Sequence, residues 1–381
     1  MFNKRTYLDY AAGISGNPSS PHSEGRCAKQ TLEDARTSIA RLLEVQPDDV
    51  VFTSGATESN ALALLGYIRA LRAAGVGNMH LLYLPSAHAS IVGNAELLAK
   101  EGVAIEALPI TECRVDTDAL AKMLRRETVL VTMDAVCGET GIIWNTREVA
   151  NILQTRSVRQ IGGHSVSATP VPVLHVDASQ APLTEKIARA HFSADMLSLD
   201  ASKIGTTRGM GALIAHRTIP IVPFYTGGGQ ERGLHPGSEN SELAKSFATD
   251  LYSAVCGREK FRVSAERTRA QLIKIIASTI PGVLINEGRA QSPNILNLSF
   301  PGRDTDYLVA LLDEEGFAVS TRSACETDSE DGSRAVFVLT GDAIRARSTL
   351  RISWGPGIRS REFARFAKVL GRIAASATWN N

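Results

Sequence analysis

Two residues of this chain, Asp177 and Lys203, are of the types that carry out imine chemistry on a pyridine ring. Asp177 follows a short apolar run at residues 173–176, and Lys203 comes soon after another at 196–199. Both are therefore expected at carboxyl ends of strands, the edge where open α/β sheets bind ligands. A carboxylate there can keep a pyridine nitrogen protonated, and a lysine can form an imine with an aldehyde. On these two residues alone, an ordinary surface salt bridge is the favoured interpretation.

A third element, the turn Thr-Ser-Gly-Ala-Thr-Glu-Ser-Asn at residues 53–60, follows a predicted strand and opens a predicted helix. The free backbone N–H groups of Ala56 and Thr57, with the helix dipole behind them, would form a cradle for a phosphate. Alone, such a turn can be no more than a helix cap. A phosphate cradle, an aspartate and a lysine in this order together point to pyridoxal 5'-phosphate as cofactor.

The segment that must position these residues alternates between β-branched runs and amphipathic stretches from residue 20 to 215, which is typical of βα units. Strands are predicted at 50–53, 81–84, 104–109, 129–133, 173–176, 196–199 and 211–215. Helices are predicted at 23–43, 58–73, 90–100, 117–125 and 146–154, and a loop or hairpin at 155–172. The pattern predicts an α/β fold with a mostly parallel sheet flanked by helices.

The pattern changes after the glycine run at residues 227–229. It predicts helices at 241–280, 304–315 and 361–375, and strands at 283–286, 294–300, 318–320 and 350–353. We therefore expect two domains. Residues 15–240 form the large cofactor-binding α/β domain, and residues 1–14 and 241–381 form a smaller α+β domain.

Composition limits the class of partner. Among 381 residues, 41 lysines and arginines face 40 aspartates and glutamates, so no overall charge attracts nucleic acid or an anionic membrane. The sequence has no apolar run long enough to span a membrane and no signal peptide, which predicts a cytoplasmic protein. Five scattered cysteines support neither a disulfide framework nor a metal site. The expected partner is a small molecule or another protein.

Several motifs, in order and spacing, resemble those of class V aminotransferases, and within that family of cysteine desulfurases. They are residues 7–12, 17–20, 54–60, 175–180, 227–233, 323–325 and 350–353. The resemblance covers nearly the whole chain. It implies the pyridoxal-phosphate-dependent transferase fold of the aspartate aminotransferase type, and a homodimer with its active sites at the interface.

The resemblance also implies a role for each matching residue. Lys203 would form the imine and move protons, Asp177 would hold the ring nitrogen, Gln180 would donate to the phenolic oxygen, and His88 would stack on the ring. Thr57 would bind the phosphate, together with Ser238 of a second subunit. Arg351 and Asn17 would hold the substrate carboxylate. Without the resemblance, His88 would pass for a structural histidine and Arg351 for a surface ion pair.

Cys325 would be the nucleophile that takes sulfur from L-cysteine as a persulfide and leaves L-alanine. A free cysteine is usually a buried apolar residue, but the polar sequence at about 321–335 predicts an exposed loop. Four acidic residues between 326 and 331 disfavour the thiolate there, and only Arg322 opposes them. The thiol is therefore expected to be activated inside the active site.

Four positions depart from the family pattern around the cofactor. Gly138 stands where an asparagine is usual near the substrate, and Ser202 where a histidine helps to bind the phosphate. Asp200 replaces a serine or threonine, so it must turn away from the phosphate, be protonated or meet a cation. His235 replaces an arginine. These changes bear on cofactor affinity and substrate choice.

The sequence favours a dimeric cysteine desulfurase that passes sulfur to an acceptor protein for iron–sulfur clusters or tRNA thiolation. Two alternatives remain open at this stage. One is another lyase or transaminase of the same fold, such as one acting on selenocysteine. The other is a scaffold for sulfur relay that has lost catalysis, which Gly138, Asp200 and Ser202 would favour.

Overall fold

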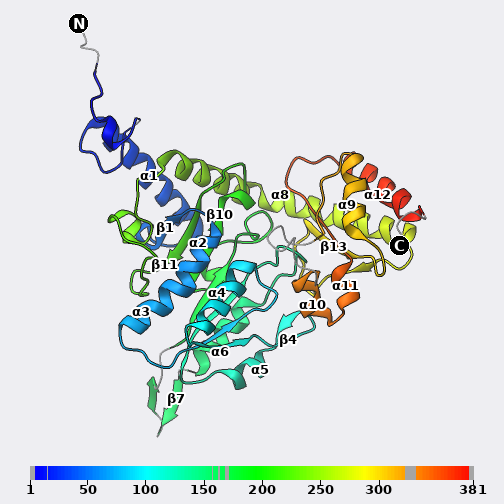
Figure 1. Ribbon diagram of the computed structural model, residues 1–381, viewed down its shortest axis with the longest axis horizontal. Coiled ribbons are helices and arrows are strands. Elements are labelled where there is room, and N and C mark those ends of the chain that lie inside the picture. Colours follow the sequence, from blue (N-terminus) through cyan, green and yellow to red (C-terminus); the bar gives the residue numbers. More distant parts are fainter. Residues whose placement is uncertain are drawn as a thin grey trace.

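The structure is a computed structural model that describes residues 5–14, 16–156, 158–161, 164–167, 171–321 and 332–376. Figure 1 shows a larger part built around one sheet and a smaller part at the C-terminal end of the chain, with one long helix running through both.

A seven-stranded sheet forms the centre of the larger part. Its order is β1 (Val50–Thr53), β11 (Gly211–Ala215), β10 (Met196–Asp200), β9 (Val173–Asp177), β6 (Thr128–Asp134), β2 (His80–Tyr83) and β3 (Ala104–Ala107). The strands from β10 to β3 are parallel, and β11 is antiparallel to both of its neighbours. The predicted α/β fold with a mostly parallel sheet is confirmed.

The helices that connect these strands begin at polar caps. His88 accepts from the amide of Ser90 at the start of α4, and Asp116 caps α5. One helix is continuous from Ala56 to Ala73 and contains a π-helical segment, η3. The helices of the larger part are α1 (Ser23–Leu43), α2 (Ala56–Ala61), η3 (Leu62–Gly66), α3 (Tyr67–Ala73), α4 (Ala89–Lys100), α5 (Thr117–Met123), α6 (Thr146–Arg156) and α7 (Arg189–Phe192).

The smaller part contains a three-stranded antiparallel sheet in the order β12 (Leu284–Ile285), β13 (Ile295–Ser299) and β14 (Thr349–Ser353). Its helices are α9 (Thr305–Glu314), α10 (Arg334–Thr340), α11 (Ala343–Arg347) and α12 (Ser360–Ala375). The 39-residue helix α8 (Ser241–Thr279) leads into this part.

Helix α8 contributes to the apolar cores on both sides. Phe247 and Leu251, in its first half, pack with buried residues of the large sheet and α1. Leu272 and Ile276, in its second half, pack with β13, β14 and α12. The two halves of α8 therefore belong to two separate apolar cores, one in each part of the structure. The domain boundary at residue 240 stays a prediction.

The expected elements differ from the structure in a few places. The strand predicted at 318–320 is only a bridge between Ser320 and Arg351. Helices α10 and α11 were not predicted, because each is short and starts in polar sequence at Ser333 and Asp342. A short hairpin that was not predicted forms from β4 (Ile110–Thr111) with β5 (Arg114–Val115). The hairpin of β7 (Val158–Ile161) with β8 (His164–Ser167) falls in the segment 155–172, where a loop or hairpin was predicted. None of the described helices is apolar enough over a sufficient length to cross a membrane.

Candidate active site

Asp177 and Lys203 lie where the sequence places them. Asp177 is the last residue of β9, and Lys203 ends the short 3₁₀ helix η4 (Ala201–Lys203) directly after β10. Asp177 pairs with Ser198 in the parallel ladder between these neighbouring strands. Both residues therefore lie at the carboxyl edge of the sheet, and β10, which precedes Lys203, is the neighbour of the antiparallel strand β11.

The carboxylate of Asp177 is buried and held on both oxygens. Its Oδ1 accepts from the Ser179 amide at 2.9 Å and from the Ser179 hydroxyl at 2.6 Å. Its Oδ2 accepts from Nδ2 of Asn60 at 2.7 Å. Asn60, which is fully buried, keeps its Oδ1 without a hydrogen-bond partner among the described residues. The acceptor oxygens of Asp177 and Asn60 lie together here, and a bound group with an N–H donor would satisfy the unpaired oxygen of Asn60.

A hydrogen-bonded chain connects Asp177 to His88 through buried side chains. Nδ2 of Asn60 donates to Oγ of Ser90 at 2.9 Å, and Oγ of Ser90 lies 2.8 Å from Nδ1 of His88. Nδ1 also accepts from the Ser90 amide at 3.2 Å. Because Nδ1 acts as the acceptor, the neutral imidazole carries its proton on Nε2. The sequence singled out His88 but not its link to Asn60, although Asn60 closes the 53–60 motif.

A buried histidine, His175, braces the strands beneath the site. Nδ1 of His175 lies 2.8 Å from Oγ1 of Thr132 on β6, and its Nε2 lies 2.9 Å from Oγ of Ser198 on β10. Burial lowers the pKa of His175 to about 4, so the ring is neutral and joins three adjacent strands. This contact fixes β9, which ends two residues later at Asp177.

Asp134 is an unexpected acid beside the site. It is the last residue of β6, pairs with Asp177 across the parallel ladder and is 5% exposed. Its Oδ1 has no hydrogen-bond partner among the described residues. Burial, followed by the neighbouring Asp177 carboxylate, raises the pKa of Asp134 to about 8. Asp134 is therefore mostly protonated at neutral pH.

A cavity of about 360 Å³ opens beside Lys203. It is lined by predicted site residues from both parts of the chain, including Gly138, Gln180, Ser202, Lys203 and Arg351. A β-carbon added at Gly138 would lie 3.0 Å from Nε2 of Gln180, which is tighter than ordinary contact. The glycine thus gives room to the Gln180 amide, at the position where the family pattern has an asparagine.

Arg351 reaches this cavity from β14. Its Nη1 donates to the Gly138 carbonyl at 3.3 Å, and its backbone amide donates to the Ser320 carbonyl at 2.6 Å. The arginine therefore connects the small sheet to the loop after β6, facing the cavity that Lys203 also lines. Asn17, its expected companion on the substrate carboxylate, does not line this cavity.

The N-terminus of α2 lies next to the end of β10. Ala56 is buried and Thr57 is exposed in the first turn. Oδ2 of Asp200 accepts from the Ala56 amide at 3.0 Å, while its Oδ1 accepts from the amide and hydroxyl of Ser202 at 2.8 and 2.6 Å. The three expected outcomes for Asp200 beside a phosphate stay predictions. The carboxylate binds within the predicted phosphate cradle.

His235 also has a partner that the sequence did not predict. Its Nδ1 lies 2.8 Å from Oε1 of Glu58, whose Oε2 accepts from the amide and hydroxyl of Ser54. The hydrogen bond with Glu58 raises the pKa of His235. The histidine that replaces the family's arginine therefore forms an ion pair within the first turn of α2.

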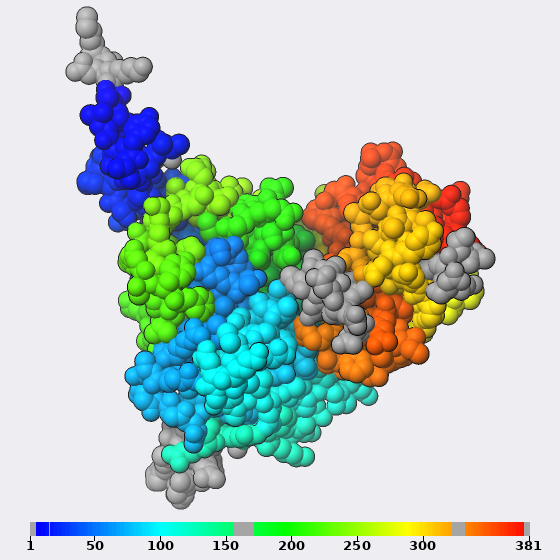
Figure 2. Space-filling model, viewed as in Figure 1, coloured from blue at the N-terminus to red at the C-terminus, as the bar shows by residue number. Residues whose placement is uncertain are grey.

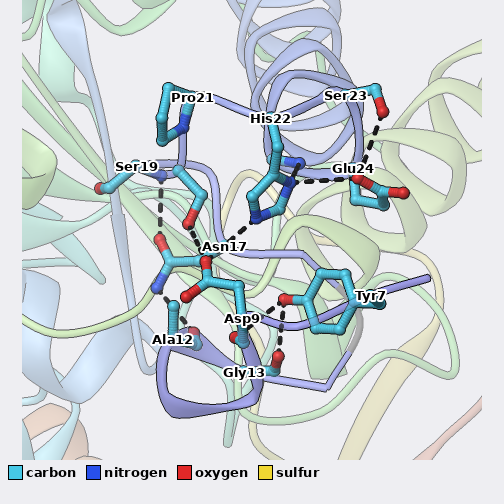
Figure 3. Close-up of polar contacts among 12 residues, drawn as sticks. Tyr7, Asp9, Ala12, Gly13, Asn17, Ser19, Pro21, His22, Ser23 and Glu24 are labelled. Atoms are coloured by element: carbon cyan, nitrogen blue, oxygen red, sulfur yellow. Dashed lines mark hydrogen bonds and ion pairs between the residues drawn. The ribbon is translucent and has the colours of Figure 1, made fainter. Parts of the chain in front are cut away.

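Asn17 and Ser238 contact each other outside the cavity. Nδ2 of Asn17 donates to the Ala12 carbonyl at 3.1 Å and to Oγ of Ser238 at 3.3 Å. Figure 3 shows Asn17 within a polar cluster that includes Asp9, Ser19 and His22. Figure 2 shows the first described residues, in dark blue, standing out from the body of the molecule. The roles of Asn17 and Ser238 stay predictions, and Cys325 lies outside the described residues.

Comparison with known proteins identifies the family. The model of class V aminotransferases matches residues 5–362. The chain belongs to the class V aminotransferase family. It is 31% identical to cysteine desulfurase IscS 1 of Archaeoglobus fulgidus over 95% of this chain and 91% of that protein.

Solved structures of related proteins have the same fold as this class V protein. A NifS-like protein superposes with a TM-score of 0.84 at 25% identity, covering 96% of this chain and 93% of that one. SspA in complex with cysteine gives 0.72 at 26% identity, covering 89% and 91%. The resemblance and the fold inferred from the sequence are confirmed.

Members of this family use pyridoxal phosphate, and the ring end of the site fits that group. Oδ1 of Asn60, beside the Asp177 carboxylate, has no hydrogen-bond partner among the described residues, and a protonated pyridine nitrogen would supply an N–H donor there. Gln180 and Lys203 line the cavity as a hydrogen-bond donor and an amine. The phosphate end fits less simply, because Asp200 binds the Ala56 amide there.

Proposed function

We propose that this protein is a pyridoxal-phosphate-dependent cysteine desulfurase that converts L-cysteine to L-alanine and transfers the sulfur to Cys325. The observation that carries the proposal is the joint placement of Lys203 and Arg351 on one cavity. The hydrogen-bonded chain from Asp177 to His88 begins at the same carboxyl edge of the sheet. An amine and a carboxylate-binding guanidinium facing one cavity suit an amino-acid substrate.

When bound, pyridoxal phosphate supplies an aldehyde for the amino group and a ring that accepts electrons from the substrate carbon. Asp177, which pairs with Asp134 of the adjacent strand, would hold the ring nitrogen in its protonated form. Lys203 would hold the aldehyde and would move a proton to and from the substrate carbon. His88 would assist proton transfer, and Gln180 would donate to the phenolic oxygen.

Arg351 orients the substrate by its carboxylate, and the thiolate of Cys325 then attacks the substrate sulfur. A sulfur–sulfur bond forms and the carbon–sulfur bond breaks, leaving its electron pair on carbon. That carbon takes a proton, L-alanine leaves, and Cys325 keeps the sulfur as a persulfide. The predicted exposed loop of Cys325 suits delivery to an acceptor protein for iron–sulfur clusters or tRNA thiolation.

We further propose a cytoplasmic homodimer in which Ser238 of one subunit reaches the phosphate group of its partner. In the single chain, Ser238 accepts from Asn17 and does not line the cavity beside Lys203, so it is available to a neighbouring subunit. Neither nucleic acid nor a membrane is part of this proposal. The near balance of 41 basic and 40 acidic residues supports a protein acceptor over direct binding to tRNA.

A visible absorption spectrum tests the central proposal. The purified protein, supplied with pyridoxal phosphate and freed of excess, should show the visible band of a lysine-bound cofactor. The Lys203→Ala variant should lack that band, while Lys122→Ala, which changes a lysine on α5, should keep it. A wild-type protein that stays colourless would refute the proposal.

Replacing Arg351 with lysine should mainly weaken substrate binding. Lysine cannot form the two parallel hydrogen bonds of a guanidinium with a carboxylate, so KM for L-cysteine should rise roughly tenfold or more. Steady-state kinetics will measure KM and kcat, with Arg359→Lys as a matched control because that side chain is 66% exposed. An unchanged KM would place the substrate carboxylate elsewhere.

A further inference from the structure

The negative charge of Asp200 lies at the turn that is predicted to bind the cofactor phosphate. It ends β10, three residues before Lys203, and its side chain reaches the first turn of the continuous helix from Ala56 to Ala73. Gly55, which precedes this helix, has a φ of +153°. A β-carbon added at Gly55 would lie 3.2 Å from Oδ2 of Asp200. The carboxylate therefore lies against the turn and not out in solvent.

Both oxygens of Asp200 are engaged. Oδ2 accepts from the Ala56 amide, which belongs to the first turn of the helix, and Oδ1 accepts from the amide and the hydroxyl of Ser202. An anion at this end of a helix is stabilised by the helix dipole and by the free N–H groups. Asp200 thus provides internally the kind of negative group that the cradle would take from a ligand.

The charges around the cradle do not compensate for this carboxylate. Asp200 forms no salt bridge with a lysine or arginine among the described residues. Glu58 adds a second carboxylate at the same turn, where it accepts from the Ser54 amide and pairs with His235. A dianionic phosphate that enters must either take the Ala56 amide from Asp200 or remain next to an uncompensated carboxylate.

We propose that the Asp200 carboxylate competes with the cofactor phosphate for the Ala56 amide. The affinity of the site for its ligand then comes mainly from contacts with the pyridine ring. The phosphate then adds little to affinity, and the unphosphorylated aldehyde pyridoxal binds almost as well as pyridoxal phosphate. This inference rests on the proposed function, because it assumes that Lys203 and Asp177 bind the ring.

The test compares two ligands that differ only in the phosphate. The apo protein is titrated with pyridoxal phosphate and with pyridoxal, and the visible band gives a Kd for each. In the wild type the ratio of the two Kd values should be small, below about tenfold. In Asp200→Ser the ratio should rise roughly tenfold or more, because the affinity for pyridoxal phosphate increases while that for pyridoxal is unchanged.

Two further variants sharpen the comparison. Asp200→Asn removes the charge but keeps an acceptor for Ser202, so it should raise the ratio even if the serine variant folds poorly. Asp116→Ser is the matched control, since Asp116 likewise accepts from backbone amides at the start of a helix, α5, and does not line the cavity. Equal ratios in wild type, Asp200→Ser and Asp200→Asn would overturn the inference and leave the proposed function standing. No visible band with either ligand in any variant would overturn both.

Discussion

Replacing Cys325 with alanine should abolish sulfide release from L-cysteine in the presence of a reductant. Without the thiol there is no acceptor for the substrate sulfur, so the rate should fall at least about 100-fold. The visible cofactor band should remain, because Lys203 is untouched. Sulfide can be measured colorimetrically, and alanine should be measured in parallel because both products depend on cleavage of the same bond.

The other cysteines make this prediction specific. Burial raises the pKa of Cys137 to about 12, and burial also raises the pKa of Cys113. Cys27 and Cys256 are exposed, but they lie on helices α1 and α8 and do not line the cavity beside Lys203. Cys27→Ala and Cys256→Ala are therefore matched controls and should release sulfide at the wild-type rate. Normal release by Cys325→Ala would assign that thiol a structural role only.

The second large effect is on stability. Asp134→Asn should stabilise the apo protein, and the gain should increase with pH. The folded-state pKa of Asp134 is raised to about 8, whereas an unfolded aspartate titrates near 3.9. Its stabilising contribution is complete below the unfolded value and is lost as pH rises through the folded value. The free energy of unfolding of the wild type therefore falls between about pH 4 and pH 8 as Asp134 ionises. The Asp134→Asn variant has no such ionisation and does not lose this stability.

Denaturant unfolding at fixed protein concentration will measure this difference. From pH 5 to pH 8 the advantage of Asp134→Asn should grow by as much as about 4 kcal/mol, since each pKa unit corresponds to about 1.4 kcal/mol. Asp313→Asn, on the exposed side of α9, is the control for general effects of removing a carboxylate. A gain that is the same at pH 5 and pH 8 would mean that Asp134 is already ionised in the folded protein.

The sequence predicted the parts of the site that depend on local pattern. Apolar strand runs precede Asp177 and Lys203, and a small-residue turn precedes α2. Neighbouring parallel strands end at the same edge of a sheet, so the residues that follow these runs are predicted to lie together there. The helix at Ser23–Leu43 and the strands at Val50–Thr53 and Gly211–Ala215 have the predicted bounds.

The contacts that the sequence could not predict join residues far apart in the chain. Asp200 and the Ala56 amide are 144 positions apart, and Asn60 and Asp177 are 117 apart, so no local periodicity relates them. Asp134 did carry a signal, since an acid directly after a buried apolar run must end at the same sheet edge as Asp177. The raised pKa of Asp134 could not be inferred from the sequence, because it depends on burial and on the Asp177 carboxylate in the neighbouring strand.

The length of α8 limits which insertions and deletions the chain can accept. Its first half packs on the large sheet and its second half on β13 and β14, so the helix sets both the spacing and the rotation between Lys203 and Arg351. One inserted residue would advance the second half by about 1.5 Å and turn its apolar face by about 100°. Sequences descended from this one can therefore lengthen the hairpin of β7 and β8 far more easily than they can lengthen α8 by a single residue.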